Sequence, residues 1–359
     1  MASGFALAHS DAFDNRSAIA RPYQLKTFAT CIGVLGIAFF ANAAHAISLP
    51  SPGPSKVIVL DSGEAQLTLI DEQSRQVVGT ASTGKEPHHL MITPDQKSLI
   101  VANSVSNSLM FVDPDNATVQ RELQDIEDPY QLGFSPDHRW FVTAALRLDR
   151  VDIYRFDGRD FSIAKRVALA KTPSHMTFSS DAHIVYVTLQ DSGELAAIDL
   201  ATQSVLWKIP VGRDPAGLWM TPGDRSLLVG MTGEDDVVVV DPHLHQVVKR
   251  IHTGRGAHNF RNLDDGRHVA VTNRVANTIS ILDYTTLQNT GEIDNLMPGP
   301  DDMELSADRR FLWVTFRFSR HVGVIDLPAR KLVATIAVGR SPHGIYFQNR
   351  APVYPPNPD

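Results

Sequence analysis

The sequence predicts an all-β fold, a seven-bladed β-propeller. The basis for this prediction is two residue ladders, that is, two series of residues that recur along the chain at the same interval. Seven aspartates each end a hydrophobic run, and consecutive members lie 42 to 44 residues apart. A second ladder, mostly of proline, runs beside the first at the same intervals. A repeat of about 40–45 residues with four short strand-like segments is typical of propeller blades. The first ladder is Asp71, Asp113, Asp157, Asp199, Asp241, Asp283 and Asp326, and the second is Pro87, Pro129, Pro173, Pro215, Ala257, Pro300 and Pro342.

Each repeat is expected to form one blade of four strands, as residues 84–126 illustrate. Hydrophobic and β-branched runs, separated by turn residues, predict strands at 88–93, 98–103, 108–112 and 118–123. Runs such as Leu-Ile-Val-Ala and Val-Val-Val-Val favour strands over helices, and no stretch after the first 46 residues has a persuasive helical period.

The two ends of the repeat array predict how the ring closes. Residues 56–82 supply three strands with no innermost strand before them, whereas residues 343–348 form an innermost strand with no partners after it. The C-terminal strand is therefore expected to complete the N-terminal blade, which removes exposed sheet edges. The propeller is expected to span residues 47–349. A Pro-rich tail at 350–359 is expected to be disordered and dispensable for stability.

The first 46 residues have the features of an export signal. Three basic residues precede an apolar run at 28–43, and Ala44-His45-Ala46 follows as a small-residue cleavage pattern. The run is short for a membrane-spanning helix, which needs about 20 residues. We expect cleavage after Ala46, a periplasmic or secreted location and no membrane span in the mature chain. An uncleaved anchor is the alternative.

Composition narrows the classes of partner and cofactor. The only cysteine, Cys31, lies in the leader, so the mature chain would have no disulfide, no thiolate metal site and no covalent c-type haem. Removing the leader leaves 30 basic and 38 acidic residues, a net charge of −8. Nucleic acid is not an expected partner, because binding to phosphates depends on basic surfaces. We expect a monomer.

The repeat units also resemble a known family. The segments VGRDPAGLWMTPGDRSLLVG, VTNRVANTISILD and VGRSPHGIYF are similar to the YVTN-type β-propeller repeat, related to the haem d1 propeller of cytochrome cd1 nitrite reductase and to surface-layer propellers. The resemblance covers residues 55–348. It implies the fold strongly and the function weakly, because this fold supports many unrelated activities.

Propeller topology divides the loops between two faces. Loops joining the first to the second strand and the third to the fourth strand share one face, here called the turn face. Their sequences are repetitive turn formers, and we expect the seven aspartates to cap turns there. The other loops, between the second and third strands and between successive blades, share the opposite face, here called the hub face.

Histidine, aspartate and arginine gather at positions assigned to the hub face. The residues directly after the second ladder begin the innermost strands and should point toward the central axis, and the loops between the second and third strands add arginines nearby. Turn formation does not require these residue types. The candidate binding residues are His88, His89, His175, His258, His343, Asp301, Asp302, Arg147, Arg274, Arg317 and Arg320.

Three interpretations of this cluster, here called the hub, remain open. The side chains could line a wet channel mouth and bond neighbouring loops. They could ligate a metal or a haem-like cofactor; relatives with haem d1 place a histidine on this face, and His88, His258 and His343 occupy equivalent repeat positions. They could also bind an anionic small molecule through arginine.

The sequence therefore predicts an exported binding or scaffold protein that uses the hub face for a small ligand, a cofactor or a partner protein. The alternative is an enzyme or cofactor-handling protein of haem d1-related, lactonase or lyase type. Such an enzyme would need an acid–base pair or a metal at the channel mouth. No catalytic residue can be assigned from the sequence.

Overall fold

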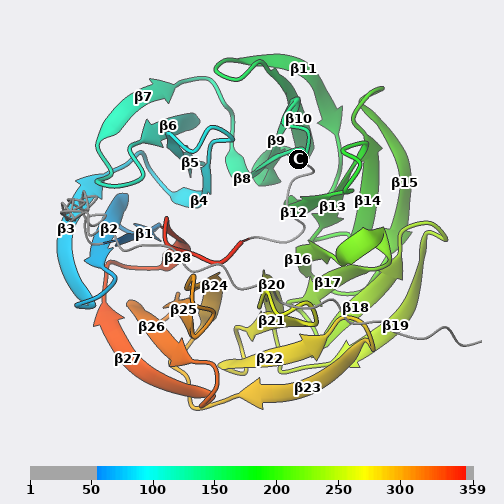
Figure 1. Cartoon of the computed structure of the whole chain (residues 1–359). Helices are drawn as coiled ribbons and strands as arrows, with labels where there is room; N and C mark the ends of the chain where they lie inside the picture. The colour runs from blue at the N-terminus through cyan, green and yellow to red at the C-terminus, as the bar shows by residue number, and fades with distance from the viewer. Residues whose placement is uncertain (1–54, 353–359) are drawn as a thin grey trace, which may run out of the picture. The chain divides into compact units, whose positions relative to one another are not determined.

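Seven four-stranded antiparallel sheets surround a common axis in the computed structural model, which describes residues 55–352 (Figure 1). The predicted all-β seven-bladed propeller is therefore confirmed. The predicted leader and the end of the Pro-rich tail lie outside the described residues. Two short 3₁₀ helices, η1 (Leu146–Leu148) and η2 (Pro222–Asp224), are the helical elements of the described part. Within residues 55–352, no helix is long and apolar enough to cross a membrane.

The strands take one of four positions in a blade. The innermost are β4 (Pro87–Ile92), β8 (Pro129–Phe134), β12 (Pro173–Phe178), β16 (Pro215–Met220), β20 (Ala257–Asn262), β24 (Pro300–Leu305) and β28 (Pro342–Phe347). The second are β1 (Lys56–Asp61), β5 (Leu99–Asn103), β9 (Trp140–Ala145), β13 (Ile184–Leu189), β17 (Leu227–Met231), β21 (His268–Asn273) and β25 (Phe311–Phe316). The third are β2 (Gln66–Asp71), β6 (Ser108–Val112), β10 (Arg150–Phe156), β14 (Glu194–Asp199), β18 (Asp236–Asp241), β22 (Thr278–Asp283) and β26 (His321–Asp326). The outermost are β3 (Gln76–Ser82), β7 (Val119–Leu123), β11 (Phe161–Ala168), β15 (Ser204–Pro210), β19 (Gln246–His252), β23 (Gln288–Ile293) and β27 (Lys331–Ala337).

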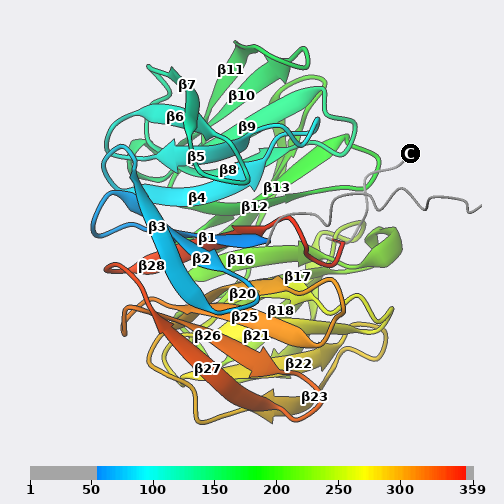
Figure 2. The same ribbon diagram turned by 60° about the vertical axis from the view of Figure 1, so that its left-hand side comes forward.

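Ring closure follows the prediction. Strand β28 pairs antiparallel with β1, so the sheet order of blade 1 is β28-β1-β2-β3 (Figure 2, red beside blue). Blades 2 to 7 follow in sequence order, from β4–β7 to β24–β27. Blade 1, which contains both ends of the array, therefore lies between blade 7 and blade 2, and β28 contacts both β24 and β4.

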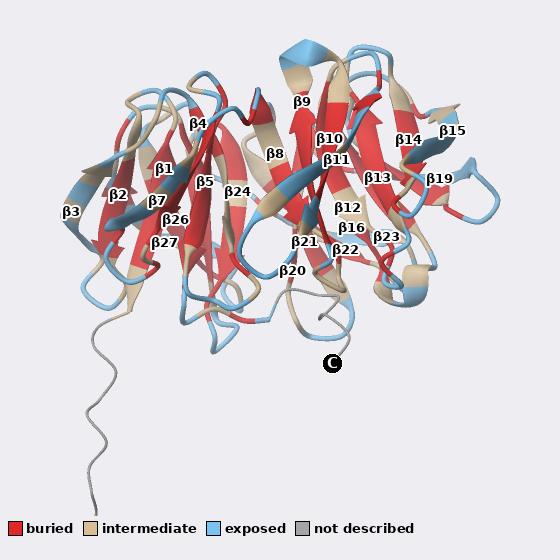
Figure 3. Cartoon of the chain, turned by 90° about the horizontal axis from the view of Figure 1, so that it is seen from above, coloured by how far each residue is buried: buried red, intermediate tan, exposed pale blue. Residues whose placement is uncertain are grey.

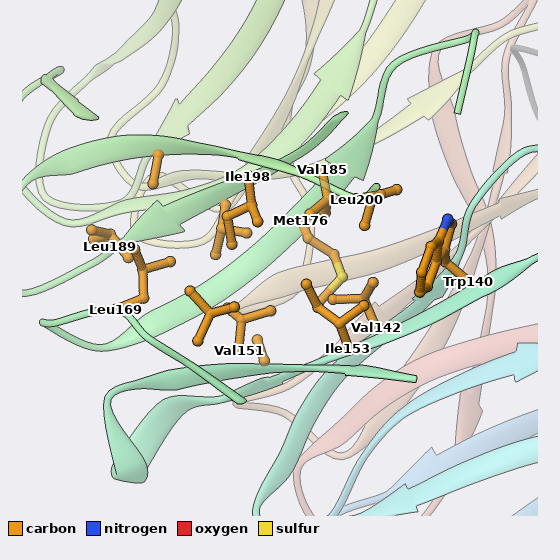
Figure 4. Close-up of a cluster of buried hydrophobic side chains, with 14 residues drawn as sticks. Trp140, Val142, Val151, Ile153, Leu169, Met176, Val185, Leu189, Ile198 and Leu200 are labelled. Atoms are coloured by element: carbon orange, nitrogen blue, oxygen red, sulfur yellow. The ribbon is translucent and has the colours of Figure 1, made fainter. Parts of the chain in front are cut away.

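The hydrophobic core lies between neighbouring blades. The second and third strands are buried on both faces, whereas the outermost strands alternate between exposed and half-buried residues (Figure 3). This explains why the second and third strands read as continuous apolar runs. Between blades 3 and 4, Trp140, Ile153, Met176, Val185 and Ile198 pack into one cluster (Figure 4). Burial of such side chains is worth about 1.5–3 kcal/mol each.

The turn-face aspartates act as predicted. Each of the seven accepts a hydrogen bond from the backbone N–H two or three residues later, as Asp71 does from Ser74 at 2.8 Å. The first-to-second-strand turns repeat a second device. There, a serine or threonine hydroxyl donates to an aspartate two residues on, as Thr93 does to Asp95 at 2.7 Å. The turns of the turn face are therefore stabilised by the same side-chain hydrogen bonds in blade after blade.

Candidate functional site

The start of each innermost strand brings the hub side chains to the axis. Directly after the second-ladder residue, the pairing of the innermost strand with its neighbour shifts register, as between Pro87 and His89 or between Pro300 and Met303. Such bulges redirect side chains that would otherwise alternate between faces. Two successive residues per blade can therefore reach the hub. We call the residue directly after the ladder the first-layer residue and the next one the second-layer residue.

Backbone hydrogen bonds tie the two kinds of hub-face loop together. Ser104 N–H donates to the Glu86 carbonyl at 3.1 Å, and Arg274 N–H donates to the Gly256 carbonyl at 2.9 Å. The same bond recurs in blades 1, 4, 5 and 7. The predicted grouping of these loops on one face is therefore correct.

Threonines of the second strands, which were not among the predicted site residues, hold the bulges in place. Thr188, Thr272 and Thr315 each accept a hydrogen bond from a second-layer N–H, at 3.0–3.2 Å. Thr188 and Thr272 also donate to a first-layer carbonyl of the next blade, both at 2.9 Å. The sequence signal is a recurring Val-Thr near the end of the second strand.

Five of the seven first-layer residues form a chain of side-chain contacts around the axis. The ring centroids of His343 and His88 are 4.2 Å apart, and His88 stacks on Tyr130 at 3.7 Å. On the other side of His343, the chain continues to the two preceding blades. Nε2 of His343 lies 3.7 Å from Asp301, and Nδ1 of His258 lies 3.3 Å from the same carboxylate.

The second-layer residues continue this contact network. His89 meets His175 edge-on at 5.7 Å, and His175 in turn meets His258 at 4.9 Å. Asn259 donates its side-chain amide to Asp302. All five predicted histidines and both predicted aspartates therefore belong to one connected hub. Tyr130 and Asn259 also belong to the hub, although they were not among the predicted site residues.

Three of these histidines could ligate a metal together. Donor nitrogen atoms of His88, His89 and His343 all lie within 4.8 Å of one another. His88 and His343 are almost completely buried, at 2% and 0% exposure. The two strands that supply the group, β4 and β28, are the innermost strands of blades 2 and 1, so ring closure assembles the group.

Hydrogen bonds determine which ring nitrogen of His89 is available. Nδ1 of His89 lies 2.7 Å from the Tyr130 carbonyl, which can only accept, so Nδ1 carries the proton. Nε2 of His89 is then left with a lone pair. An N–H bonded to a backbone carbonyl on one side and a free nitrogen on the other is the usual arrangement of a metal-ligating histidine.

Several buried imidazole nitrogens in the hub have no hydrogen-bond partner in the described part of the chain. They are Nε2 of His175, Nδ1 of His258 and both nitrogens of His343. Carboxylate oxygens lie 3.2–3.7 Å from Nδ1 of His258 and from both nitrogens of His343. Buried polar atoms normally have partners, so these nitrogens fit an ion or a small polar ligand.

Asp301 is the anionic centre of the hub. Arg274 donates to Oδ1 of Asp301 through Nε at 2.9 Å and also through a terminal nitrogen, and Arg317 reaches Oδ2 at 3.4 Å. Burial alone would raise the pKa of Asp301, but Arg274, the neighbouring imidazoles and Arg317 hold it well below its usual range. Asp301 is therefore ionised at neutral pH. Asp302, with Oδ2 3.2 Å from Nδ1 of His343, has a lowered pKa as well, because His343 outweighs the effect of burial.

The imidazoles around this centre favour the neutral form. Burial, reinforced by neighbouring His343, lowers the pKa of His89 to about 4. Burial also lowers the pKa values of His88, His175 and His258 well below the usual value. Neutral imidazole is the form that binds metals.

The structure separates the predicted site residues into two groups. Arg274 and Arg317 belong to the hub, but Arg147 and Arg320 do not join it. Arg147 binds Asp128 at 2.6 Å, and Arg320 binds Glu64 at 3.0 Å. His258 belongs to the hub but contacts Asp301 and His175, while His89 completes the close histidine group with His88 and His343.

A second group of possible metal ligands lies elsewhere. Asp235, Asp236 and His252 have ligand atoms within 4.8 Å of one another. Asp235 and His252 are exposed, and Arg250 contacts Asp236 at 3.3 Å. A water-exposed acidic group with an arginine partner needs no ion.

The comparison with known families decides the classification of this chain. Residues 25–353 match the YNCE-like beta-propeller family. The chain belongs to this family. No curated protein sequence matches the chain.

Solved structures share the propeller at low sequence identity. A functionally unknown protein from Desulfotomaculum acetoxidans has a TM-score of 0.71 at 13% identity, covering 81% of this chain and 98% of that one. A putative 6-phosphogluconolactonase from Bacteroides fragilis has a TM-score of 0.67 at 11% identity, covering 83% and 99%. Dihydro-heme d1 dehydrogenase NirN in complex with DHE has a TM-score of 0.64 at 16% identity, covering 83% and 76%. At these low identities, the structural similarity shows only that the proteins share a fold.

Proposed function

We propose that this YNCE-like propeller is an exported binding protein that holds a divalent transition-metal ion in its hub. The ligands would be His88, His89 and His343. The observation that carries the proposal is the convergence of their donor nitrogens within 4.8 Å of one another, in a site where His88 and His343 are buried.

The chemistry of the donor set supports a transition metal. Imidazole suits Zn, Cu, Fe and Ni, whereas Ca and Mg prefer sites made of oxygen ligands. The lowered pKa values of His88 and His89 keep protons from competing with the ion at these two ligands. The Asp302 carboxylate, 3.2 Å from Nδ1 of His343, favours a proton on that nitrogen and leaves Nε2 to the metal.

A haem-like cofactor is the alternative that the fold similarity to NirN suggests, and the hub residues do not fit it. A macrocycle needs an open face above its ligating imidazole. Among the hub histidines, His88, His175, His258 and His343 are at most 2% exposed, so such a ring would have to displace the side chains that close the hub. The same burial argues against an acid–base enzyme of lactonase or lyase type, because a catalytic histidine must reach its substrate.

Export remains part of the proposal. The basic residues, the apolar run at 28–43 and the Ala44-His45-Ala46 pattern support cleavage after Ala46. N-terminal sequencing of the protein from its native host should read Ile-Ser-Leu-Pro. A chain that retains residues 28–43 would contradict export by cleavage.

The metal proposal is tested by calorimetric titration of chelator-treated protein with Zn²⁺ and Cu²⁺. The background is His243→Ala with His245→Ala, because this exposed turn-face pair could bind metal by itself. On that background, His89→Ala should abolish the high-affinity site, whereas His258→Ala should keep it. Equal binding by both variants, or no binding by the parent, would refute the assignment of the ligands.

A further inference from the structure

We infer that the metal-loaded hub binds a small anion as an additional ligand. This inference rests on the proposed metal site and adds the class of ligand that the site accepts. Two independent features carry it, the balance of charge in the hub and a buried imidazole nitrogen that has no partner.

The carboxylates and the guanidinium groups of the hub are equal in number before a metal binds. Asp301 and Asp302 supply two negative charges, and Arg274 and Arg317 supply two positive charges. An imidazole that gives a lone pair to a metal ion carries no charge of its own, so the three ligand histidines do not alter this balance in the loaded hub. Asp301 is completely buried, and the Arg274 and Arg317 side chains are only 15% and 22% exposed, so these opposite charges face each other largely away from bulk water.

A divalent ion would upset this balance. With neutral imidazole ligands, the loaded hub would have a net charge of about +2. An uncompensated charge in a poorly solvated site is costly, and an anion bound to the metal or next to it reduces that cost. Three protein ligands also leave a fourth position open in tetrahedral coordination, as in metal sites that accept an exogenous ligand.

The hub provides a polar group for such an anion. His175 is 1% exposed, and its Nε2 atom has no hydrogen-bond partner in the described chain. Its ring lies 5.7 Å from that of His89, one of the proposed metal ligands. A protonated Nε2 here would donate to an anion held next to the metal. Ser174 Oγ, 3.1 Å from Nδ1, can donate to that nitrogen and so favour this tautomer.

The burial pattern limits the size of the anion. Most first-layer side chains are closed to solvent, and the remaining exposure belongs to half-buried Tyr130 and to second-layer residues such as His89, Asn259 and Asp302. An anion that enters the hub without displacing these side chains has to be small. Larger substrates would have to displace the histidines. The expected class is therefore a small inorganic or one-carbon monoanion.

The test uses Co²⁺-loaded protein titrated with sodium azide at constant ionic strength, followed by visible absorption. We expect a saturable change of the cobalt bands. Arg317→Gln, which removes one positive charge, should weaken azide binding about tenfold, and Asp302→Asn, which removes one negative charge, should strengthen it about tenfold. Arg317→Lys should keep the wild-type affinity, because it keeps the charge.

Different outcomes separate this inference from the metal proposal. If Co²⁺ binds with the spectrum of a histidine site but azide leaves the bands unchanged, the anion inference fails and the metal proposal stands. A shift of azide affinity in the same direction for Arg317→Gln and Asp302→Asn would also refute the anion inference. If neither the wild-type protein nor the His89→Ala variant binds Co²⁺, the metal proposal and the anion inference fail together.

Discussion

At the scale of single residues, the hub depends on which nitrogen of each imidazole is occupied. Tyr130 holds the proton on Nδ1 of His89 through its carbonyl, at 2.7 Å. Asp302 lies 3.2 Å from Nδ1 of His343 and favours a proton there. Both contacts leave Nε2 for a ligand. Residues that never touch a metal could thus set the affinity of the site.

The first prediction concerns Asp302. Replacing Asp302 with alanine should weaken Zn²⁺ binding about 10–100-fold, because His343 loses the carboxylate that orients its proton. The measurement is calorimetric titration, with Asp191→Ala, an exposed hub-face loop residue, as the control. Equal affinities of the two variants would show that Asp302 has no influence on the ligands.

A second prediction at this scale concerns acid stability of the metal-free protein. The pKa of His258 in the folded protein is lowered by burial and by nearby Arg274, so the unfolded chain binds its proton at a higher pH. Stability should therefore decrease as pH falls below about 6.5, by up to about 1.4 kcal/mol per pH unit for each such histidine. Urea unfolding between pH 7 and 5 measures this slope, and His258→Asn should flatten it. An unchanged slope in that variant would contradict the assigned pKa direction.

At the scale of strands, the beginning of each innermost strand is where the repeat departs from regular pairing. The register shift directs two successive side chains inward, and a threonine of the second strand bonds the displaced backbone. In blade 5, Gly230 stands at the position of this threonine, and Gly217 is the second-layer residue. A side chain at Gly217 would overlap the carbonyl oxygen of His258, so β16 can approach β20 only because position 217 has no Cβ atom.

Gly217→Ala should therefore destabilise the protein by about 1–3 kcal/mol or more, because two backbones would have to separate. Gly79→Ala is the matched control, since a Cβ atom at this outer-strand glycine meets nothing within 4 Å. Urea denaturation of both variants measures the difference. Similar stabilities would show that the close approach of β16 to β20 is not required.

The end of the chain shows a contact that the sequence did not reveal. Buried Arg261 of β20 donates to the carbonyls of Ala351 at 2.8 Å and Pro352 at 3.3 Å, and Ala351 N–H donates to Leu305 at 2.8 Å. Residues 350–352 are thereby attached to blades 6 and 7. The remainder of the predicted tail lies outside the described residues.

Two truncations test this attachment. Deleting 350–359 should cost about 1–3 kcal/mol, because the buried Arg261 guanidinium loses carbonyl acceptors. Deleting 353–359 leaves those acceptors in place and should keep the wild-type stability. Thermal unfolding of the two truncations is the measurement. Equal stability would favour the sequence-based expectation that the whole segment from residue 350 is dispensable.

At the scale of the whole molecule, the proposed metal site lies where the ring closes. His343 belongs to β28, which completes blade 1, and His88 and His89 belong to blade 2. An ion bound by all three would connect the last strand of the chain to the second blade. Metal binding and ring closure should therefore stabilise each other.

This coupling predicts a metal-dependent melting temperature. At free Zn²⁺ of about 100 times Kd, folding should gain about 2.7 kcal/mol, and the melting temperature should rise accordingly. The triple variant His88→Ala, His89→Ala, His343→Ala should show no such rise. Differential scanning calorimetry with and without metal makes this measurement, and a rise of equal size in the variant would place the stabilising ion elsewhere.

The fold was predictable because every blade has the same pattern of strands and turns. Apolar second and third strands and capped turns recur at a fixed interval, so spacing alone revealed blade number and closure. The site was less predictable. Repeat equivalence placed His258 beside His88 and His343, but contact also depends on blade adjacency, and His258 belongs to blade 6. The bulge that brings His89 inward beside His88 has no clear sequence signal, and the partners that hold Arg147 and Arg320 away from the hub lie in distant parts of the chain.

The proposed metal site is tested most directly by an anomalous difference map from a crystal that is soaked in Zn²⁺ and measured at the zinc edge. We expect a peak in the hub about 2.0–2.1 Å from one nitrogen each of His88, His89 and His343. The proposed site would be contradicted by a peak only at the exposed group of Asp235, Asp236 and His252. It would also be contradicted by the absence of a peak in the hub of a crystal soaked to saturation with Zn²⁺.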